Sequence, residues 1–204
     1  QDAARRWGLH AGDAVVVYDD FRSVSAARAW WLLRGAGVSD IRVLDGGLSA
    51  WRATGLPLET GDVSPEPGSI LFDGVEEGIS IDEAAAWPQR GVLLDARAPE
   101  RYRGESEPFD PVAGHIPGAV NLPADAVLDG ASFAPPATIR AAFESVGVSD
   151  LTSVAAYCGS GLTAAHTALA GAAAGLDVAV YPGSWSQWSN TAGRPVATGA
   201  EPGA

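Results

Sequence analysis

The sequence predicts an α/β protein in which helices pack on a mainly parallel β-sheet. Short apolar runs that are typical of buried strands alternate with helical patterns along the chain. The run at residues 91–95 is almost wholly apolar, as expected for a parallel strand that is covered on both faces. The alternation of strand and helix also occurs twice, as an internal repeat, and this order is typical of a layered α/β fold.

The two copies of the repeat lie near opposite ends of the chain. The first contains a strand, a helix, a second strand and a turn rich in Gly, Ser and Trp, which we expect at residues 14–19, 26–35, 41–44 and 45–51. The second follows the same order, with a Gly-rich turn after its first strand, at residues 153–158, 163–174, 178–181 and 183–188.

The second copy is preceded by elements for which the first copy has no counterpart. Ser80 is an expected N-cap with Glu83 three residues later, so residues 81–87 are predicted to form a short helix. The other expected elements are a buried strand, a loop rich in Pro and Gly, and another short helix, at residues 91–95, 108–123 and 139–145.

This asymmetry and the local composition indicate two domains. Residues 61–78 carry Pro65, Pro67, several Gly and acidic residues, so we predict a linker there. Residues 79–204 would form a complete domain, and residues 1–60 only the C-terminal half of another. The chain begins with Gln and contains no Met, so we expect a processed form or a fragment.

Charge and composition exclude several classes of function. The net charge of −12 argues against nucleic acid or an anionic membrane as the main partner. All 13 basic residues are Arg, so a lysine Schiff base and a P-loop lysine are impossible. The single Cys excludes an intramolecular disulfide, and the 3 His show no zinc-ligand spacing, so we expect no metal site. No apolar stretch is long enough to span a bilayer, and an unpaired Cys fits a reducing cytoplasm.

The first strand of the second copy leads into a candidate reactive loop. Residues 157–164 read Tyr-Cys-Gly-Ser-Gly-Leu-Thr-Ala, so a strand ends, a Gly-rich turn follows and a helix begins. This arrangement directs backbone N–H groups and the positive end of a helix at the sulfur of Cys158. The usual thiol pKa of about 8.5 falls in such a position, which favours the reactive thiolate. The alternative is an inert, buried cysteine.

Several further motifs, taken with this loop, carry a family resemblance. They read Asp-Ala-Arg, Arg-Tyr-Arg-Gly, Gly-His-Ile-Pro-Gly-Ala, Gly-Ser-Trp-Ser-Gln-Trp and Asp-Gly-Gly-Leu-Ser-Ala-Trp, at residues 95–97, 101–104, 114–119, 183–188 and 45–51. The chain resembles the tandem-domain rhodaneses, sulfurtransferases of the thiosulfate and 3-mercaptopyruvate class, over nearly its whole length. The resemblance implies a rhodanese-like three-layer α/β/α fold with a catalytic C-terminal domain and an inactive N-terminal one.

The mechanism that the resemblance implies is a ping-pong transfer. The Cys158 thiolate takes a sulfur atom from a small anionic donor, becomes a persulfide, and passes the sulfur to a thiophilic acceptor such as cyanide or a thiol. No metal or organic cofactor is needed. Inactive domains of the family usually have Asp in place of Cys, and Asp19 stands opposite Cys158 in the repeat.

The loop that follows Cys158 is expected to bind the donor and to influence which donor is preferred. The expected binding residues are Gly159, Ser160, Gly161, Leu162 and Thr163. The neutral residues just after Cys resemble the pattern of enzymes that prefer 3-mercaptopyruvate. The hydroxyl of Ser160 either assists proton movement or only forms a hydrogen bond within the loop.

Arg101 matches the family arginine that binds the anionic group of the donor, and a guanidinium can grip a carboxylate or a sulfonate with two hydrogen bonds. Mercaptopyruvate enzymes commonly have a second Arg in a Glu-Pro-Arg context. Here residues 107–110 read Glu-Pro-Phe-Asp, so that clamp is missing or is replaced by Arg103. Both donors therefore remain open.

Other conspicuous residues are expected to be structural. His115 would brace the turn in which it lies, and Asp95 and Arg97 would form an internal ion pair. His166 is expected to be a surface or packing residue. The indoles of Trp185 and Trp188 would anchor the core or a domain interface, although one of them could wall the donor pocket.

Two rival functions are weighed against sulfur transfer. Cysteine phosphatases also hold an anion at a helix N-terminus, but they need Arg at the sixth position after Cys, where this chain has Ala164. The second rival is a non-catalytic sulfur carrier or interaction module with the same fold.

Overall fold

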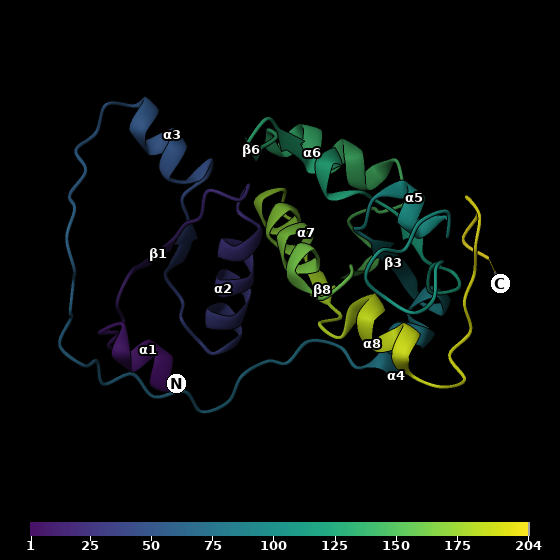
Figure 1. The fold of residues 1–204 in the computed structure, drawn as a ribbon, viewed down its shortest axis with the longest axis horizontal. Helices are drawn as coiled ribbons and strands as arrows, with labels where there is room; N and C mark the ends of the chain where they lie inside the picture. Colours follow the sequence, from purple (N-terminus) through teal and green to yellow (C-terminus); the bar gives the residue numbers. More distant parts are fainter. Residues whose placement is uncertain (204) are drawn as a thin grey trace. The chain divides into compact units, whose positions relative to one another are not determined.

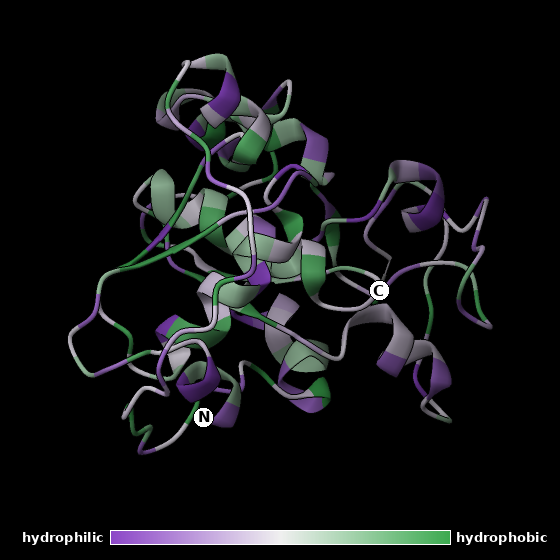
Figure 2. Ribbon diagram, turned by 60° about the vertical axis from the view of Figure 1, so that its left-hand side comes forward, coloured by the Kyte–Doolittle hydropathy of each residue, from purple (hydrophilic) through white to green (hydrophobic). Residues whose placement is uncertain are grey.

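The structure is a computed structural model that describes residues 1–203, and it divides into two compact units, Gln1–Glu77 and Gly78–Ala204 (Figure 1). Figure 2 shows hydrophobic and hydrophilic residues alternating along most helices, as expected for helices with one face packed on a core. None of the helices within residues 1–203 has the length and apolar content needed to cross a membrane.

The first unit has a two-stranded parallel sheet with helices connected to it. In chain order its elements are α1 (Asp2–Arg6), β1 (Val15–Val17), α2 (Val24–Gly35), β2 (Ile41–Val43) and α3 (Gly47–Ala53). The register pairs Val16 with Arg42. Because α2 connects two parallel strands, this unit contains the β–α–β arrangement that the first copy of the repeat predicts.

The expected linker lies largely against the first unit. Ile70 is buried in the same core cluster as Leu33 and Val38, and its backbone N–H donates to the carbonyl of Leu9. The Glu76 N–H donates to the Gly35 carbonyl at the end of α2. The burial of Ile70 and these backbone hydrogen bonds together hold this otherwise irregular segment against the first unit.

The second unit is built on a four-stranded parallel sheet in the order β4-β3-β7-β8. The strands are β3 (Gly91–Asp95), β4 (Val120–Asn121), β7 (Ser153–Tyr157) and β8 (Val178–Val180). The register pairs Asp95 with Tyr157, so the carboxyl ends of β3 and β7 lie side by side. The predicted α/β class with a mainly parallel sheet is confirmed. A short antiparallel pair, β5 (Leu128–Asp129) and β6 (Ser132–Phe133), lies outside this sheet.

Helices cover both faces of this sheet. The helices are α4 (Ile81–Ala86), η1 (Trp87–Gln89), α5 (Pro99–Tyr102), η2 (Ala124–Val127), α6 (Pro136–Glu144), α7 (Leu162–Ala173) and α8 (Ser184–Asn190). Leu93 and Ala155 share a core cluster with residues of α4, η1 and α8. Alternate strand residues point to the opposite face, where α7 packs on β7 and β8 and contacts α6 (Figure 1).

The helix at α4 begins as the sequence predicts. The Glu83 N–H donates to Ser80 Oγ at 3.2 Å, and the Ser80 N–H donates to Glu83 Oε2 at 2.7 Å, so both halves of the capping box form. The backbone hydrogen bond from Ser80 lowers the pKa of Glu83.

The two Gly/Ser/Trp segments were expected to be turns, and this expectation is wrong. Both fold as short helices, α3 and α8. In α8, Trp185 and Trp188 are three residues apart, so one helix face carries both indoles into the core, where they are 0% and 1% exposed. Burial of two large aromatic side chains outweighs the weak helix propensity of Gly and Ser.

Candidate active site

Cys158 lies where the structure joins β7 to α7. Its side chain is buried, and its Sγ accepts a hydrogen bond from the Gly161 N–H at 3.2 Å. Gly161 is the N-cap of α7 and has φ = 82°, a left-handed conformation that favours glycine. The first turn of α7 therefore presents its N-terminal end to the sulfur, as the sequence predicts.

The backbone on both sides of this sulfur is held by α8. The Cys158 N–H donates to Ser184 Oγ at 3.1 Å, and the Trp185 N–H donates to the Cys158 carbonyl at 2.9 Å. The Ser186 N–H donates to the Gly159 carbonyl at 2.9 Å. Three consecutive residues of α8 thus fix the loop. Ser184 and Ser186 were not predicted to belong to the site. Their place just after β8, the last strand of the second repeat copy, was the sequence feature that could have indicated it.

Arg101 lies at the end of α5 and contacts the loop. A Cβ added to Gly159 would be 3.4 Å from Arg101 Nη1, so the guanidinium lies directly beside the residue that follows Cys158. Arg101 also packs 5.2 Å from the centre of the Phe109 ring, which is itself exposed to solvent. The structure therefore brings together Arg101 and Cys158, which are separated by more than fifty residues in the sequence.

The guanidinium of Arg101 is already paired with carboxylates. Its Nη2 lies 2.6 Å from Glu107 Oε1 and 3.6 Å from Asp110 Oδ2. The side chains of Glu107 and Asp110 are 3% and 6% exposed, so water screens these pairs poorly. Asp110 Oδ2 also accepts a hydrogen bond of 3.2 Å from Ser186 Oγ, which ties the 107–110 loop to α8.

The predicted ion pair of Asp95 and Arg97 forms at the end of β3. Arg97 Nη2 is 2.6 Å from Asp95 Oδ2, and both side chains are almost fully buried. Burial lowers the pKa of Arg97, but the adjacent Asp95 carboxylate raises it further, and the net direction is upward. Arg97 Nη1 also donates to Glu107 Oε2 at 3.2 Å, so Glu107 bridges Arg97 and Arg101.

The other sequence-predicted residues occupy different environments. Ser160 and Leu162 are exposed, and Thr163 is partly exposed at the start of α7. Arg103 forms two hydrogen bonds with Glu105, of 2.7 and 2.8 Å, so its guanidinium is engaged by that exposed carboxylate. The binding roles expected of the loop residues stay predictions.

Both histidines of the second unit are buried. His115 Nδ1 lies 2.8 Å from the Tyr102 carbonyl and its ring stacks on Tyr102, which agrees with a bracing role. His166 is 0% exposed and stacks on Phe133, so it is a packing residue and not a surface residue.

Asp19 in the first unit occupies the turn between β1 and α2. Its carboxylate accepts hydrogen bonds from the N–H groups of Phe21, Ser23 and Ala26, at 2.7, 2.9 and 2.8 Å. The carboxylate of Asp19 therefore accepts the hydrogen bonds of these three backbone N–H groups. Because a carboxylate cannot accept a sulfur atom, this turn lacks the group needed for persulfide chemistry.

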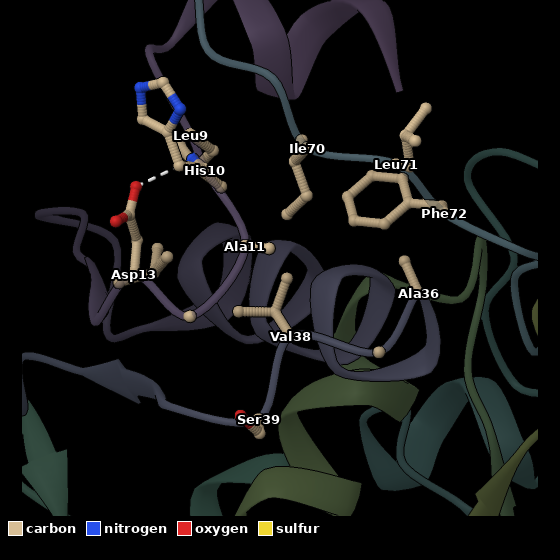
Figure 3. Close-up of a pocket in the computed structure, with 13 residues that line it drawn as sticks. Leu9, His10, Ala11, Asp13, Ala36, Val38, Ser39, Ile70, Leu71 and Phe72 are labelled. Atoms are coloured by element: carbon tan, nitrogen blue, oxygen red, sulfur yellow. Dashed lines mark hydrogen bonds between the residues drawn. The ribbon is translucent and has the colours of Figure 1, made fainter.

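A small pocket lies elsewhere in the first unit (Figure 3). It has a volume of about 110 Å³, and its lining includes Val38, Ile70 and Phe72. The His10 N–H donates to Asp13 Oδ2 at its rim. Small-molecule sites usually have several times this volume. Within residues 1–203, no group of three or more His, Cys, Asp or Glu side chains is arranged to hold a metal ion.

Comparison with known proteins agrees with this geometry. Residues 1–54 and 80–191 match the family described as the Rhodanese-like domain. The chain belongs to the rhodanese family. The two matched segments of this rhodanese include the Asp19 turn and the Cys158 loop.

Relatives of this rhodanese are named as sulfurtransferases. The chain is 45% identical over 204 residues to a Mycobacterium tuberculosis protein that bears the name thiosulfate sulfurtransferase SseB, covering 98% of this chain and 72% of that protein. It is 34% identical to the 3-mercaptopyruvate sulfurtransferase of Escherichia coli, covering 95% of this chain and 71% of that protein.

Solved structures show the same fold. The 3-mercaptopyruvate sulfurtransferase SseA from Escherichia coli superposes with a TM-score of 0.78 at 32% identity, covering 90% of this rhodanese and 71% of that chain. A variant of EanB that carries a cysteine persulfide superposes with a TM-score of 0.86 at 26% identity, covering 97% of this chain and 54% of that one.

Proposed function

We propose that this rhodanese is a sulfurtransferase that carries sulfane sulfur on Cys158, from thiosulfate or 3-mercaptopyruvate to a thiophilic acceptor such as cyanide or a thiol. The observation that carries the proposal is the position of Cys158 Sγ at the start of α7, where the Gly161 N–H donates to it at 3.2 Å. Relatives named as thiosulfate and 3-mercaptopyruvate sulfurtransferases support both donors.

In the first half-reaction, the Cys158 thiolate attacks the outer sulfur of thiosulfate. A sulfur–sulfur bond forms to Cys158, the original sulfur–sulfur bond breaks, and sulfite leaves with its electron pair. With 3-mercaptopyruvate the carbon–sulfur bond breaks instead, and the carbon takes the electron pair and a proton to give pyruvate. In the second half-reaction, cyanide or a thiolate attacks the outer sulfur, and the Cys158 thiolate leaves.

The protein holds charge at two places during these steps. Backbone N–H groups of residues 159–163 at the start of α7 would stabilise the thiolate and the terminal sulfur of the persulfide. Arg101, which lies against Gly159, would bind the sulfonate or carboxylate of the donor. Ser160 is an exposed residue, so we expect its hydroxyl to contact the donor from the solvent side.

The two units would have different roles, and only the second would be catalytic. We assign catalysis to the domain at residues 79–204 and a non-catalytic role to residues 1–60, with residues 61–78 connecting them. The support is the Asp19 carboxylate, which takes the backbone donors of its own turn. The reactive thiol also needs a reducing compartment, which favours the cytoplasm.

Intact-protein mass spectrometry tests the proposal. We expect the native chain to gain the mass of one sulfur atom after incubation with thiosulfate or 3-mercaptopyruvate, and to lose it on addition of cyanide. The variant Cys158→Ser should gain no mass, while circular dichroism shows an unchanged fold. A native chain that gains no sulfur from either donor would contradict the proposal and favour the non-catalytic carrier or interaction module.

A further inference from the structure

The charges that surround Arg101 do not balance. Two guanidinium groups, of Arg97 and Arg101, lie among three carboxylates, of Asp95, Glu107 and Asp110. These side chains are all less than 20% exposed, so their charges act on each other and on a bound donor with little screening. The thiolate of Cys158 would add another negative charge.

Asp110 is connected to the Cys158 loop in two ways. Its Oδ2 lies 3.6 Å from Arg101 Nη2, and Arg101 lies against Gly159. The same oxygen accepts from Ser186 Oγ, and the Ser186 N–H donates to the Gly159 carbonyl. The carboxylate of Asp110 is thus linked to Gly159, the residue that follows Cys158, through both Arg101 and Ser186.

Asp110 and Glu107 make different contributions to this cluster. Glu107 bridges Arg97 and Arg101, so its removal would take a carboxylate from two guanidinium groups at once and leave Arg97 with Asp95 alone. Of the two guanidinium groups, Asp110 contacts only that of Arg101, which is already paired with Glu107 at 2.6 Å. The charge of Asp110 is therefore in excess of what Arg101 needs for its own burial.

We propose that Asp110 is a specificity-determining residue that selects the sulfur donor by its charge, which rests on the function proposed above. The excess carboxylate reduces the positive potential that Arg101 offers to a donor. A doubly charged donor such as thiosulfate loses about twice as much attraction as a singly charged carboxylate, because the Coulomb energy is proportional to donor charge. Asp110 thus favours donors that carry one negative charge, such as 3-mercaptopyruvate. It acts through Arg101 and is a positioning residue.

The test compares two donors in two variants. Asp110→Asn keeps the shape and the acceptor for Ser186 but removes the charge. We expect kcat/KM to rise about tenfold for thiosulfate and about threefold for 3-mercaptopyruvate, with cyanide as acceptor. Asp110→Glu, which keeps the charge, should retain the native ratio of the two values. A purely structural role would change both donors by the same factor.

Glu105→Gln is the matched control on the same loop. Glu105 is 57% exposed and pairs with Arg103, so water and salt screen its charge and the donor ratio should stay native. An unchanged ratio in Asp110→Asn, or a shift towards 3-mercaptopyruvate, would overturn the inference.

A binding measurement separates this inference from the proposed function. Isothermal titration calorimetry with sulfate and with pyruvate compares a dianion and a monoanion without any turnover. If Asp110→Asn raises the ratio of sulfate affinity to pyruvate affinity about threefold, the inference is supported. This holds even if the native chain transfers no sulfur, because a lack of transfer would contradict only the proposed function. Active native chain with no change in either ratio contradicts only the inference, and the absence of both binding and turnover contradicts both.

Discussion

Arg101 and Cys158 meet because two strands of one sheet end side by side. Cys158 follows β7 directly, and Arg101 lies on α5, a few residues after the end of β3. The parallel pairing of Asp95 with Tyr157 brings these two strand ends together. Side chains that follow the carboxyl ends of neighbouring parallel strands commonly share one site.

We predict that Arg101→Ala lowers kcat/KM for either donor by about tenfold or more, because the donor loses its charged hydrogen-bond partner. Steady-state kinetics with cyanide as acceptor measure the effect. Arg103→Ala is the control, since Arg103 is held by the exposed Glu105 and should change kcat/KM little. An Arg101→Ala variant with native kcat/KM and a native melting temperature would remove Arg101 from the site.

Among the helices and strands, local patterns predicted those with a capping motif or an apolar run, and they missed short elements rich in Gly and Ser. The capping box at Ser80 and the apolar strand β3 were predicted with nearly their observed bounds. The segments α3 and α8 were not recognised as helices, because Gly and Ser are typical of turns. The β5–β6 pair was also missed, although Asp129-Gly130 is a common hairpin signal and Gly130 has φ = 64°.

The start of α7 is the element on which the sulfur site depends. A Cβ at Gly161 would meet the Pro182 carbonyl oxygen at 2.5 Å, and φ there is 82°. We predict that Gly161→Ala costs about 3 kcal/mol of unfolding free energy and displaces the N–H that bonds Cys158. Urea unfolding and the rate of persulfide formation measure the two effects.

Gly147→Ala is the matched control, because Gly147 has a similar φ of 88° and open space around its Cβ position. We expect a cost of about 1 kcal/mol and unchanged persulfide formation. If the two variants were equally stable, close contact with Pro182 would not be the reason for a glycine at position 161.

At the scale of the whole molecule, buried tyrosines link stability to alkaline pH. Burial raises the pKa of Tyr102 to about 12, and burial also raises the pKa of Tyr157. In the unfolded chain these phenols lose their protons near pH 10, whereas in the folded chain they keep them to higher pH. Their contribution to stability is therefore fully present below about pH 10 and is lost as the pH rises towards 12.

We predict that the free energy of unfolding falls steadily between pH 10 and 12, and that Tyr102→Phe makes this fall less steep. The variant also loses the hydrogen bond of 2.7 Å from Tyr102 Oη to the Ala119 carbonyl, so it should be less stable than the native chain at pH 8. Urea titrations at several pH values measure both the stability at pH 8 and the decrease in the free energy of unfolding between pH 10 and 12. Parallel pH profiles for the two proteins would contradict the assignment to Tyr102.

Local sequence patterns specify the α/β class, the repeat of strand and helix, and the position of Cys158 between a strand and a Gly-rich helix start. These features depend on local propensity and on the period of apolar residues, which neighbouring residues specify. The sequence also singled out Arg101, through its motif, but not the carboxylates that pair with it.

The arrangement of these charges depends on how the chain folds in three dimensions. The contacts of Arg101 with Glu107 and Asp110, and of Asp110 with Ser186, join segments that are far apart in the sequence or separated by an irregular loop. The burial of Ile70 likewise placed most of the expected linker on the first unit. Such contacts depend on how elements pack and on which charges water can reach. Neither property produces a regular pattern in the sequence.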